Sequence, residues 1–397
     1  AVDGRRDRLH RQRGGGLGAR VDLVMIAGRS PLDEISGGHS SYVRSHARAA
    51  TMAGFTPHIV CVGRDDATIE TAFGIIHQAA SPYRPFRQML AGLHAPYLAA
   101  AIARLQPRII HSFGVWGIAA TGFDALRIQS SYTTYRDEAL SHVRGTAAYG
   151  LRARLRFLAL YAWVAAVAER WERRAYREAD VVLVNYESVA RLIRGRHGVA
   201  SRIIAYAAES AFSDDGARTK MHGIPSIVTI ARHEPRKGND VLLRALATID
   251  LPFRAKLIGG GPLLDEHRAL APANVDVAGI VDDARPFLAA ADIFVLSSRE
   301  EQSGSLALLE ALQHGAAIIA PAVDGILEDL TDGDNALLTP PGDVDALAAA
   351  ITRVLTEGEL RRRLQRRARE TFEQRFSAAK FSAALGDVYR MRCASSS

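Results

Sequence analysis

Two glutamates that could do chemistry, Glu301 and Glu310, and several serines lie in the segment Ser297 to Pro321, which leads from a polar loop into a helical pattern and then into an apolar run. Glu301 lies in the loop, and Glu310 lies within the expected helix, which begins at Ser303 or Ser305. The first N–H groups of a helix are unpaired and carry partial positive charge, so such a loop suits an anionic ligand. Ordinary capping by the serines, with Glu310 facing solvent, is the other interpretation.

Two cations and a glycine turn precede this segment. Arg232 and Lys237 follow an apolar run that starts at Ser226, although lone charges of this kind are usually solvated. The residues KLIGGGPLLDEH then place Gly259 to Gly261 between an apolar run and a helical pattern. Glycine permits positive φ and close backbone approach, but many α/β proteins have such turns for structural reasons. The turn is not a G-x-G-x-x-G sequence, so it does not predict a dinucleotide site.

Alternating apolar runs and amphipathic patterns must position these residues. Strand-like runs begin at Val21, His58, Arg108, Arg127, Val181 and Arg202, and in the second half at Ser226, Ala255, Val275, Ile293, Ala316 and Ala336. This alternation is typical of parallel sheets wrapped by helices. We therefore expect an α/β fold with two doubly wound, Rossmann-like domains that face each other across a cleft, with ligands at the carboxyl ends of the strands.

Domain boundaries are expected where the composition changes. Residues 1–20 are rich in Arg and Gly and lack an apolar run, which predicts a disordered arm and neither a signal peptide nor a membrane span. The remaining divisions are an N-terminal domain at 21–206, a linker at 207–225, a C-terminal domain at 226–375, and a final helix within 376–397 that can cross back to the N-terminal domain.

The composition excludes several classes of protein. The chain has 397 residues, of which 48% are hydrophobic, as in a soluble globular protein. Cys61 and Cys393 form neither a disulfide framework nor a metal-ligand spacing, so a reducing cytoplasm is the expected compartment. The net charge is +7, but basic and aromatic residues do not interleave, and we expect no nucleic-acid partner.

A basic helix is expected from about Leu151 to Tyr176, where the apolar run FLALYAWVAAVA lies between RARLR and ERWERR. This run is too short to cross a bilayer. Two interpretations stay open: the helix packs on the first domain, or its basic, Trp-bearing surface makes a peripheral contact with a membrane.

Five motifs in a fixed order give the chain a family resemblance. They are VTIARHEPRKGNDVLLRAL, KLIGGGPLLDEH, VDVAGIVDDARPFLAAADIFVLSS, SSREEQSGSLALLEALQHGAAIIAP and PAVDGILEDLTDGDNALLTPPGDVDALAAAI. With them the chain resembles glycosyltransferase family 4, also called glycosyl transferases group 1, whose members are retaining, metal-independent enzymes of the GT-B fold that use nucleotide sugars. The resemblance covers about Val21 to the C-terminus and is strongest from Ser226 to Ala350.

The resemblance implies the catalytic residues Arg232, Lys237 and Glu301. Arg232 and Lys237 stand at the positions of the family's diphosphate-binding pair, where cations neutralise a leaving pyrophosphate. The family's first glutamate lies by the donor sugar, and Gln302 has its spacing from Glu310, while Glu301 is one residue farther away. We prefer Glu301, with an inserted residue in the loop. Glu310 then binds the ribose hydroxyls.

The remaining implied contacts involve backbone or weaker matches. His111 is a strand-end histidine of a kind common in the family, and Tyr135 stands near a position where many relatives contact the transferred sugar, so both are assigned to the acceptor or sugar side. The implied donor contacts are Gly37 and Gly38 in the first glycine loop, Gly259 and Gly261, the nucleobase segment Gly279, Ile280 and Val281, and the N–H groups near Ser305 and Leu306.

The expected function is retaining transfer of a hexosyl group from a nucleotide-diphosphate donor to a saccharide, lipid-linked or small-molecule hydroxyl in glycan or polysaccharide biosynthesis. The expected partners are therefore a nucleotide sugar and an acceptor, with no cofactor and no metal ion. A sugar-nucleotide-binding protein, an epimerase or a phosphorylase on the same fold is the alternative.

Overall fold

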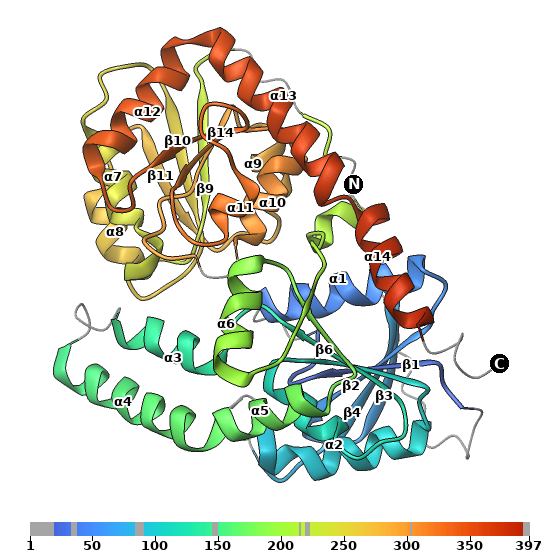
Figure 1. The fold of residues 1–397 in the computed structure, drawn as a ribbon. Helices are drawn as coiled ribbons and strands as arrows, with labels where there is room; N and C mark the ends of the chain where they lie inside the picture. The colour runs from blue at the N-terminus through green and yellow to red at the C-terminus, as the bar shows by residue number, and fades with distance from the viewer. Residues whose placement is uncertain are drawn as a thin grey trace.

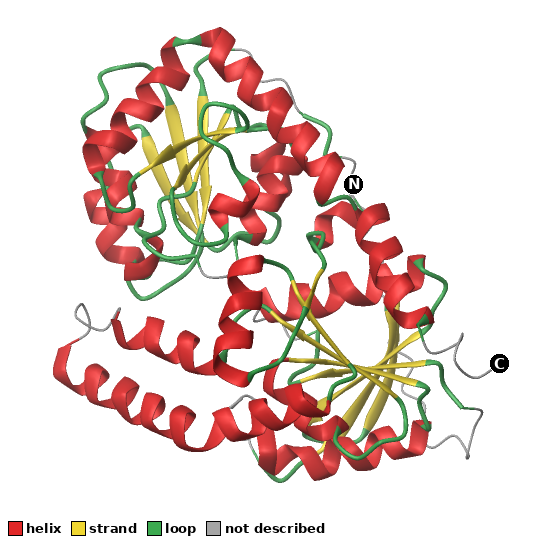
Figure 2. Cartoon of the chain, viewed as in Figure 1, coloured by secondary structure: helices red, strands yellow, loops and turns green. Residues whose placement is uncertain are grey.

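The computed structural model describes residues 20–32, 38–83, 91–144, 150–213, 216–218, 223–301 and 304–391. It contains two sheets of mainly parallel strands, each covered by helices on both faces (Figures 1 and 2). The predicted α/β fold with two Rossmann-like domains is confirmed. The predicted arm, apart from Arg20, lies outside the described residues, as do Gly37 and Gln302.

The N-terminal sheet has the strand order β3-β4-β2-β1-β5-β6-β7-β8, and only the β3–β4 pair is antiparallel. Its strands are β1 (Leu23–Ala27), β2 (Pro57–Gly63), β3 (Ala67–Thr71), β4 (Gly74–Ala80), β5 (Ile109–Phe113), β6 (Leu126–Ser131), β7 (Val181–Val184) and β8 (Arg202–Ile203). Strand β1 is buried on both faces: Leu23 and Met25 join one core cluster, and Val24 and Ile26 join another. A strand buried on both faces has a continuous apolar sequence, which explains why β1 is recognisable.

The C-terminal sheet has the order β11-β10-β9-β12-β13-β14 and is parallel throughout its described pairs. Its strands are β9 (Ser226–Ile230), β10 (Arg254–Ile258), β11 (Val275–Gly279), β12 (Ile293–Val295), β13 (Ala317–Pro321) and β14 (Ala336–Thr339). Each expected strand-like run of the sequence overlaps one of the observed strands. The antiparallel strands β3 and β4 were not expected.

Helices connect these strands. The α-helices are α1 (Gly38–Met52), α2 (Ala91–Leu105), α3 (Tyr135–Arg144), α4 (Gly150–Trp163), α5 (Glu169–Glu178), α6 (Glu187–His197), α7 (Asn239–Ala247), α8 (Leu264–Leu270), α9 (Arg285–Ala289), α10 (Leu306–Gln313), α11 (Ile326–Asp329), α12 (Val344–Thr356), α13 (Gly358–Arg375) and α14 (Ala378–Arg390). The expected long basic helix is α4 and α5, joined by the π-helical turn Val164–Ala168. Helices α3 and α4 form a hairpin that extends away from the N-terminal sheet (Figure 1).

The last helix, α14, packs on the N-terminal domain beside α1 (Figure 1). Its Arg390 donates to the carbonyl oxygen of Ala53 over 3.1 Å, and the hydroxyl of Tyr389 lies 2.7 Å from Nδ1 of His111 in β5. Because α13 belongs to the C-terminal domain and α14 lies on the other, the end of the chain ties the two domains together.

A second tie involves Tyr186, which precedes α6 in the N-terminal domain. Its side chain lies close to Gly304 and Gly325: a Cβ atom at Gly304 would come within 2.2 Å of the hydroxyl oxygen, and one at Gly325 within 3.3 Å of the ring. Its hydroxyl donates to the buried carboxylate of Asp329 over 2.5 Å. An aromatic side chain of one domain is thus enclosed by backbone of the other.

Glu328 completes this second tie. The first N–H groups of α6, those of Glu187 and Ser188, donate to the two carboxylate oxygens of Glu328 over 2.7 and 2.8 Å. Tyr186, at the N-cap position of α6, makes no capping bond with its own side chain. The carboxylate of the C-terminal domain therefore caps a helix of the N-terminal domain.

The contact between Tyr389 and His111 makes a stability prediction. Replacing Tyr389 by Phe leaves the buried Nδ1 of His111 without that partner, so we expect the free energy of unfolding to fall by about 1–3 kcal/mol. Urea denaturation measures this change. Tyr97→Phe, at an exposed position of α2, is the matched control and should change stability by less than about 0.5 kcal/mol. Equal effects of the two substitutions would contradict the proposed importance of the contact.

Candidate functional site

Apart from the first glycine loop, which follows β1, the residues expected to bind a donor follow the carboxyl ends of four adjacent strands, β11, β10, β9 and β12. The chain passes from β9 to β10 on one side, and β12 lies on the other side of β9. Parallel strands end at one edge, and a crevice forms where the strand order reverses. The loops after β9 and β12, which carry Arg232, Lys237 and Glu301, therefore meet at the position where this fold class binds ligands.

Lys237 and Glu301 form an ion pair across this crevice. Lys237 ends the short 3-10 turn Pro235–Lys237, and its Nζ pairs with Oε1 of Glu301. The two side chains are only 13% and 5% exposed. The hydroxyl of Ser298 also donates to Oε1 of Glu301 over 2.7 Å. Two charges this far from water must compensate each other, so the pair fixes one loop against the other.

Arg299 holds the same two loops together from outside. Its guanidinium makes two hydrogen bonds of 2.8 Å to the carboxylate of Asp240 in α7. The backbone N–H of Arg299 donates to the carbonyl oxygen of Arg236. Beside it, Gly238 has φ of +61°, and a Cβ atom there would lie 2.0 Å from the carbonyl oxygen of Ser297. Glycine is required at this position because the two backbones are in contact.

Arg232 differs from Lys237 in its surroundings. Its side chain is 65% exposed, and its nearest acidic partner is Glu234 at 3.8 Å. The contact is too long for a strong ion pair, and solvent screens it. Arg232 therefore presents its charge to solvent at the mouth of the crevice, whereas Lys237 is held inside.

The glycine turn after β10 lies directly against the segment that carries Arg232. A Cβ atom at Gly259 would lie 2.0 Å from the carbonyl oxygen of Ala231, and one at Gly261 would lie 2.5 Å from that of His233. Both glycines also have φ near +150°, at +143° and +153°, which other residues rarely adopt. Close packing between two backbones explains these glycines, and it sets the turn beside the cations.

The next turn, after β11, exposes an apolar side chain. Gly279 has φ of +80° and ends the strand. Ile280 is 82% exposed, whereas Val281 is partly buried against the core. An isoleucine this exposed contributes little to the packing of the domain, and its side chain is available to an aromatic ring.

Two helix starts face each other across the domains at this edge. Ser305 is the N-cap of α10, and its hydroxyl accepts the N–H of Leu308 over 3.4 Å. Leu306, the first residue of α10, lies 3.7 Å from where a Cβ atom of Gly38 would be, and Gly38 begins α1. The unpaired N–H groups of both helices therefore lie near the same space.

Glu310 lies one turn into α10 and is partly buried. Burial and the nearby carboxylate of Glu209 raise its pKa to about 7, while Arg285 opposes the shift. None of the described residues gives its carboxylate a hydrogen bond or an ion pair. A ligand that donates hydrogen bonds to the Glu310 carboxylate would stabilise its ionised form.

His111 and Tyr135 are placed differently from the other expected residues. His111 is fully buried, and its Nε2 lies 2.6 Å from the hydroxyl of Ser130 while its Nδ1 meets Tyr389. Both ring nitrogens therefore have partners within the core, and the assignment of His111 to the acceptor or sugar side stays a prediction. Tyr135 begins α3, where its N–H donates to the buried carboxylate of Glu172 over 3.2 Å. Neither residue meets the Lys237 side of the crevice in the described contacts.

Three residues that organise the site were not expected from the sequence: Ser298, Arg299 and Tyr186. Ser298 and Arg299 stand immediately before the glutamates, and a polar run of this kind predicts a loop without saying which side chain faces inward. Tyr186 bonds to Asp329 at the end of α11, which is 143 residues away in the chain. The sequence contains no local signal for such a contact.

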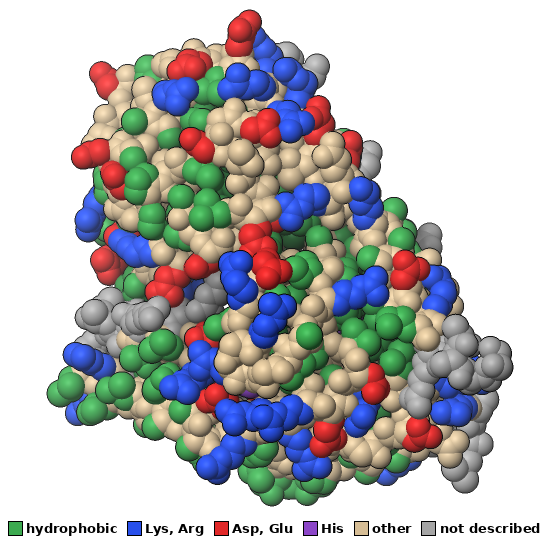
Figure 3. Space-filling model, in the orientation of Figure 1, with side chains coloured by type: hydrophobic (Ala, Val, Ile, Leu, Met, Phe, Trp, Pro, Cys, Tyr) green, Lys and Arg blue, Asp and Glu red, His purple; other side chains and the backbone are tan. Residues whose placement is uncertain are grey.

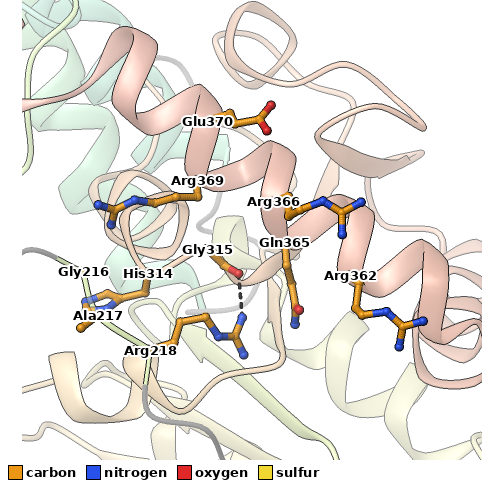
Figure 4. Close-up of a pocket in the computed structure, with 10 residues that line it drawn as sticks. All are labelled: Gly216, Ala217, Arg218, His314, Gly315, Arg362, Gln365, Arg366, Arg369 and Glu370. Atoms are coloured by element: carbon orange, nitrogen blue, oxygen red, sulfur yellow. Dashed lines mark hydrogen bonds between the residues drawn. The ribbon is translucent and has the colours of Figure 1, made fainter.

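A separate cavity of about 730 Å³ lies at the other end of α10 (Figure 4). Arg218 of the linker donates to the carbonyl oxygen of Gly315 there, and the arginines of α13 border the opposite side. The lining residues are Gly216, Ala217, Arg218, His314, Gly315, Arg362, Gln365, Arg366, Arg369 and Glu370. This cavity is not part of the crevice between the strand ends.

Within the described ranges, His, Cys, Asp and Glu side chains form no group of three that could hold a metal ion.

Comparison with known proteins identifies the family. The family profile "Glycosyltransferase Family 4" matches residues 36–205, and "Glycosyl transferases group 1" matches residues 224–357. The lipopolysaccharide core biosynthesis glycosyltransferase LpsE of Rhizobium meliloti is 34% identical over 176 residues, covering 43% of this chain and 50% of that protein. The chain spans about half the length, or less, of the curated relatives it matches.

Solved structures share the whole fold. Sucrose-phosphate synthase from Thermosynechococcus elongatus superposes with a TM-score of 0.75 at 22% identity, covering 95% of this chain and all of that chain. Anabaena Alr3699/HepE, in complex with UDP and glucose, has a TM-score of 0.65 at 15% identity and covers 94% of this chain and all of its own. Two adjoining profiles, one for each domain, together with this fold show that the chain belongs to glycosyltransferase family 4 and has the GT-B fold.

Proposed function

We propose that the protein is a retaining, metal-independent glycosyltransferase that moves a hexosyl group from a nucleotide-diphosphate donor to a hydroxyl of a saccharide or lipid-linked acceptor in glycan biosynthesis. The observation that carries the proposal is the meeting of Lys237, Glu301 and the start of α10 at the strand-order reversal, with Gly38 of the other domain facing them. The alternative of a binding protein, epimerase or phosphorylase is not favoured by the relatives.

The leaving diphosphate would bind where positive charge converges. Lys237 supplies a cation inside the crevice, Arg232 supplies one at its mouth, and the N–H groups at Ser305 and Leu306 supply helix-end dipoles. Glu301 now neutralises Lys237, so a diphosphate would compete with a carboxylate for that ammonium. Charge that is already in place stabilises a developing negative charge without reorganisation, which removes the need for a metal ion.

The nucleoside would lie along the adjoining turns. Ile280 offers an exposed apolar surface to a base, and Glu310 offers carboxylate oxygens to a ribose diol. The charges that act on Glu310 include Arg285 and Asp283, which follow Ile280 closely in the chain. The proposed positions of ribose and base are therefore adjacent. UDP, present in the HepE structure named above, is one candidate nucleotide.

The reaction that we propose needs no protein base. In a retaining transfer, the bond from the anomeric carbon to the diphosphate oxygen breaks while the acceptor hydroxyl approaches the same face. The acceptor proton passes to the leaving phosphate oxygen, and the new glycosidic bond forms between the acceptor oxygen and the anomeric carbon. Arg232 and Lys237 stabilise the departing charge. We propose that this reaction takes place in the cytoplasm, with the acceptor-binding N-terminal domain next to a membrane.

Removal of either cation tests the role of the diphosphate site. We expect Lys237→Ala and Arg232→Ala to lower kcat by about 100-fold or more, because each removes a charge that stabilises the leaving group. The measurement is release of nucleotide diphosphate from the donor identified in the ligand screen described below. Lys380→Ala is the matched control, since Lys380 is an exposed lysine of α14 outside the crevice, and it should keep wild-type activity.

The Lys237 substitution also leaves Glu301 buried without its cation, which itself destabilises the fold. The double variant Lys237→Ala with Glu301→Gln removes that unpaired charge. We expect it to recover thermal stability without recovering transfer. Full activity in Lys237→Ala and in Arg232→Ala would overturn the proposed function.

Glu310 gives a prediction about pH. The pKa of Glu310 is about 7 in the folded protein and has an ordinary value of 4.5. Between pH 4.5 and pH 7 the folded state therefore holds a proton that the unfolded state releases, and the free energy of unfolding falls as the pH rises through this range. Glu310→Gln removes this loss, and we expect the variant to exceed wild type in stability at pH 8 by up to about 3 kcal/mol, but not at pH 4. Calorimetric unfolding at both pH values measures the difference.

Donor binding should show the opposite dependence, because a carboxylate accepts hydrogen bonds from a diol better than a carboxylic acid does. In wild type, donor affinity should rise as the pH passes through about 7. In Glu310→Gln the affinity should be lower and nearly independent of pH. A variant that binds the donor as tightly as wild type at pH 8 would exclude Glu310 from the ribose site.

Thermal-shift screening with UDP-, GDP-, ADP- and TDP-sugars identifies the donor. A donor present at 100 times its Kd should stabilise the folded protein by about 2.7 kcal/mol. Addition of EDTA should leave both this shift and the rate of transfer unchanged. The absence of stabilisation by any of these sugars, or a loss of activity in EDTA that added Mg²⁺ restores, would argue against the proposed reaction.

A further inference from the structure

Helix α4 exposes leucines to solvent along one side. Leu151 and Leu155 are 72% and 57% exposed, and Leu158 and Ala162 are exposed as well. These residues are spaced i, i+4, i+7 and i+11, so they share one face of the helix. We call Leu151, Leu155, Leu158 and Ala162 the outer stripe of α4.

The opposite face of this helix is already used for packing. Val164 and Ala168, which continue α4, pack with Ala139 of α3 in one small core cluster, and Leu160 and Tyr161 of α4 pack against it. The α3–α4 hairpin is therefore held together without the outer stripe. Because the internal contacts lie on the other side, the stripe is not needed to attach the helix to the domain.

Cations lie beside the outer stripe. Arg152, Arg154 and Arg156 are exposed, and α4 itself contains no acidic residue. In the continuing α5, Glu169 and Glu172 are buried and Glu178 is half-buried and pairs with Arg174, whereas four arginines are exposed, namely Arg170, Arg173, Arg174 and Arg177. Figure 3 shows green side chains with blue ones among them along the projecting hairpin. The surface thus combines an apolar stripe with positive charge.

We infer that the outer stripe of α4 docks on an anionic lipid bilayer, with the leucines entering the boundary between headgroups and acyl chains and the arginines binding lipid phosphates. An amphipathic helix with apolar residues on one face and cations beside it is the arrangement that binds in the plane of a membrane. The helix is about 21 Å long, at about 1.5 Å per residue, which gives a flat contact. A protein partner would need acidic groups to match the arginines; a bilayer of anionic lipids supplies them over its whole surface.

This docking is peripheral. No helix in the described part of the chain is both long enough and apolar enough to cross a bilayer. Several arginines at the surface add an attraction that salt screens within a Debye length, so binding depends on ionic strength. The α3 helix, which begins at Tyr135, pairs with α4 in the same hairpin (Figure 1). If the proposed transfer is correct, docking brings the acceptor-binding domain to the surface where lipid-linked acceptors reside.

Vesicle flotation with the full chain tests the inference without any donor. The lipids are phosphatidylcholine alone and phosphatidylcholine mixed with phosphatidylglycerol. We expect wild type to bind only the anionic vesicles and to be released by added salt. The triple variant Leu151→Gln, Leu155→Gln and Leu158→Gln should lose binding at every salt concentration. The variant Arg152→Gln, Arg154→Gln and Arg156→Gln should bind about 100-fold more weakly, at about fivefold for each arginine.

Matched controls come from the C-terminal domain. Leu270→Gln changes an exposed leucine of α8, and Arg353→Gln changes an exposed arginine of α12; both should bind anionic vesicles like wild type. All variants should keep the wild-type Tm and the wild-type thermal shift with a donor sugar, which separates this inference from the proposed reaction. Vesicle binding that is absent in wild type, or retained in the leucine variant, would overturn the inference. So would concentration-dependent dimerisation that the leucine variant abolishes, because the stripe would then join two copies of the chain.

Discussion

The Lys237–Glu301 pair is the interaction on which the crevice depends. Both side chains are almost out of water, and neither charge has another opposite charge of comparable closeness among the described contacts. Separating the loops after β9 and β12 would leave an uncompensated charge in a medium that solvates it poorly. Ser298 and Arg299 reinforce this arrangement from either side. The loops are thereby ordered before any ligand arrives, which is the condition for electrostatic stabilisation at low reorganisation cost.

The fold was predictable where burial is complete. Strands such as β1 and β13 are buried on both faces and have continuous apolar sequences, so each appears in the sequence as an unmistakable run. The edge strand β3 and its neighbour β4 were missed because most of their residues are only half buried. An edge strand of this kind is stabilised by pairing with a neighbour, and the neighbour cannot be recognised from composition.

The candidate site was predictable only as far as its residues follow strand ends. Arg232 and the glycines of the β10 turn lie together because four parallel strands end at one edge. Spacing could not decide whether Glu301 or Gln302 faces inward, since a loop can absorb one residue without changing the strands around it. The structure gives Glu301 a cation, while Gln302 lies outside the described residues. The bond from His111 to Tyr389 joins residues 278 positions apart, which no local pattern can show.

Helix α6 receives its N-terminal cap from the opposite domain. Because Glu328 accepts the first two N–H groups of α6, any movement that separates the domains also uncaps this helix and hands those groups to water. Loss of a cap destabilises a helix by roughly 1 kcal/mol. Fraying of α6 and separation of the two domains are therefore thermodynamically linked. Part of the free energy that holds the domains together is the free energy of capping this helix.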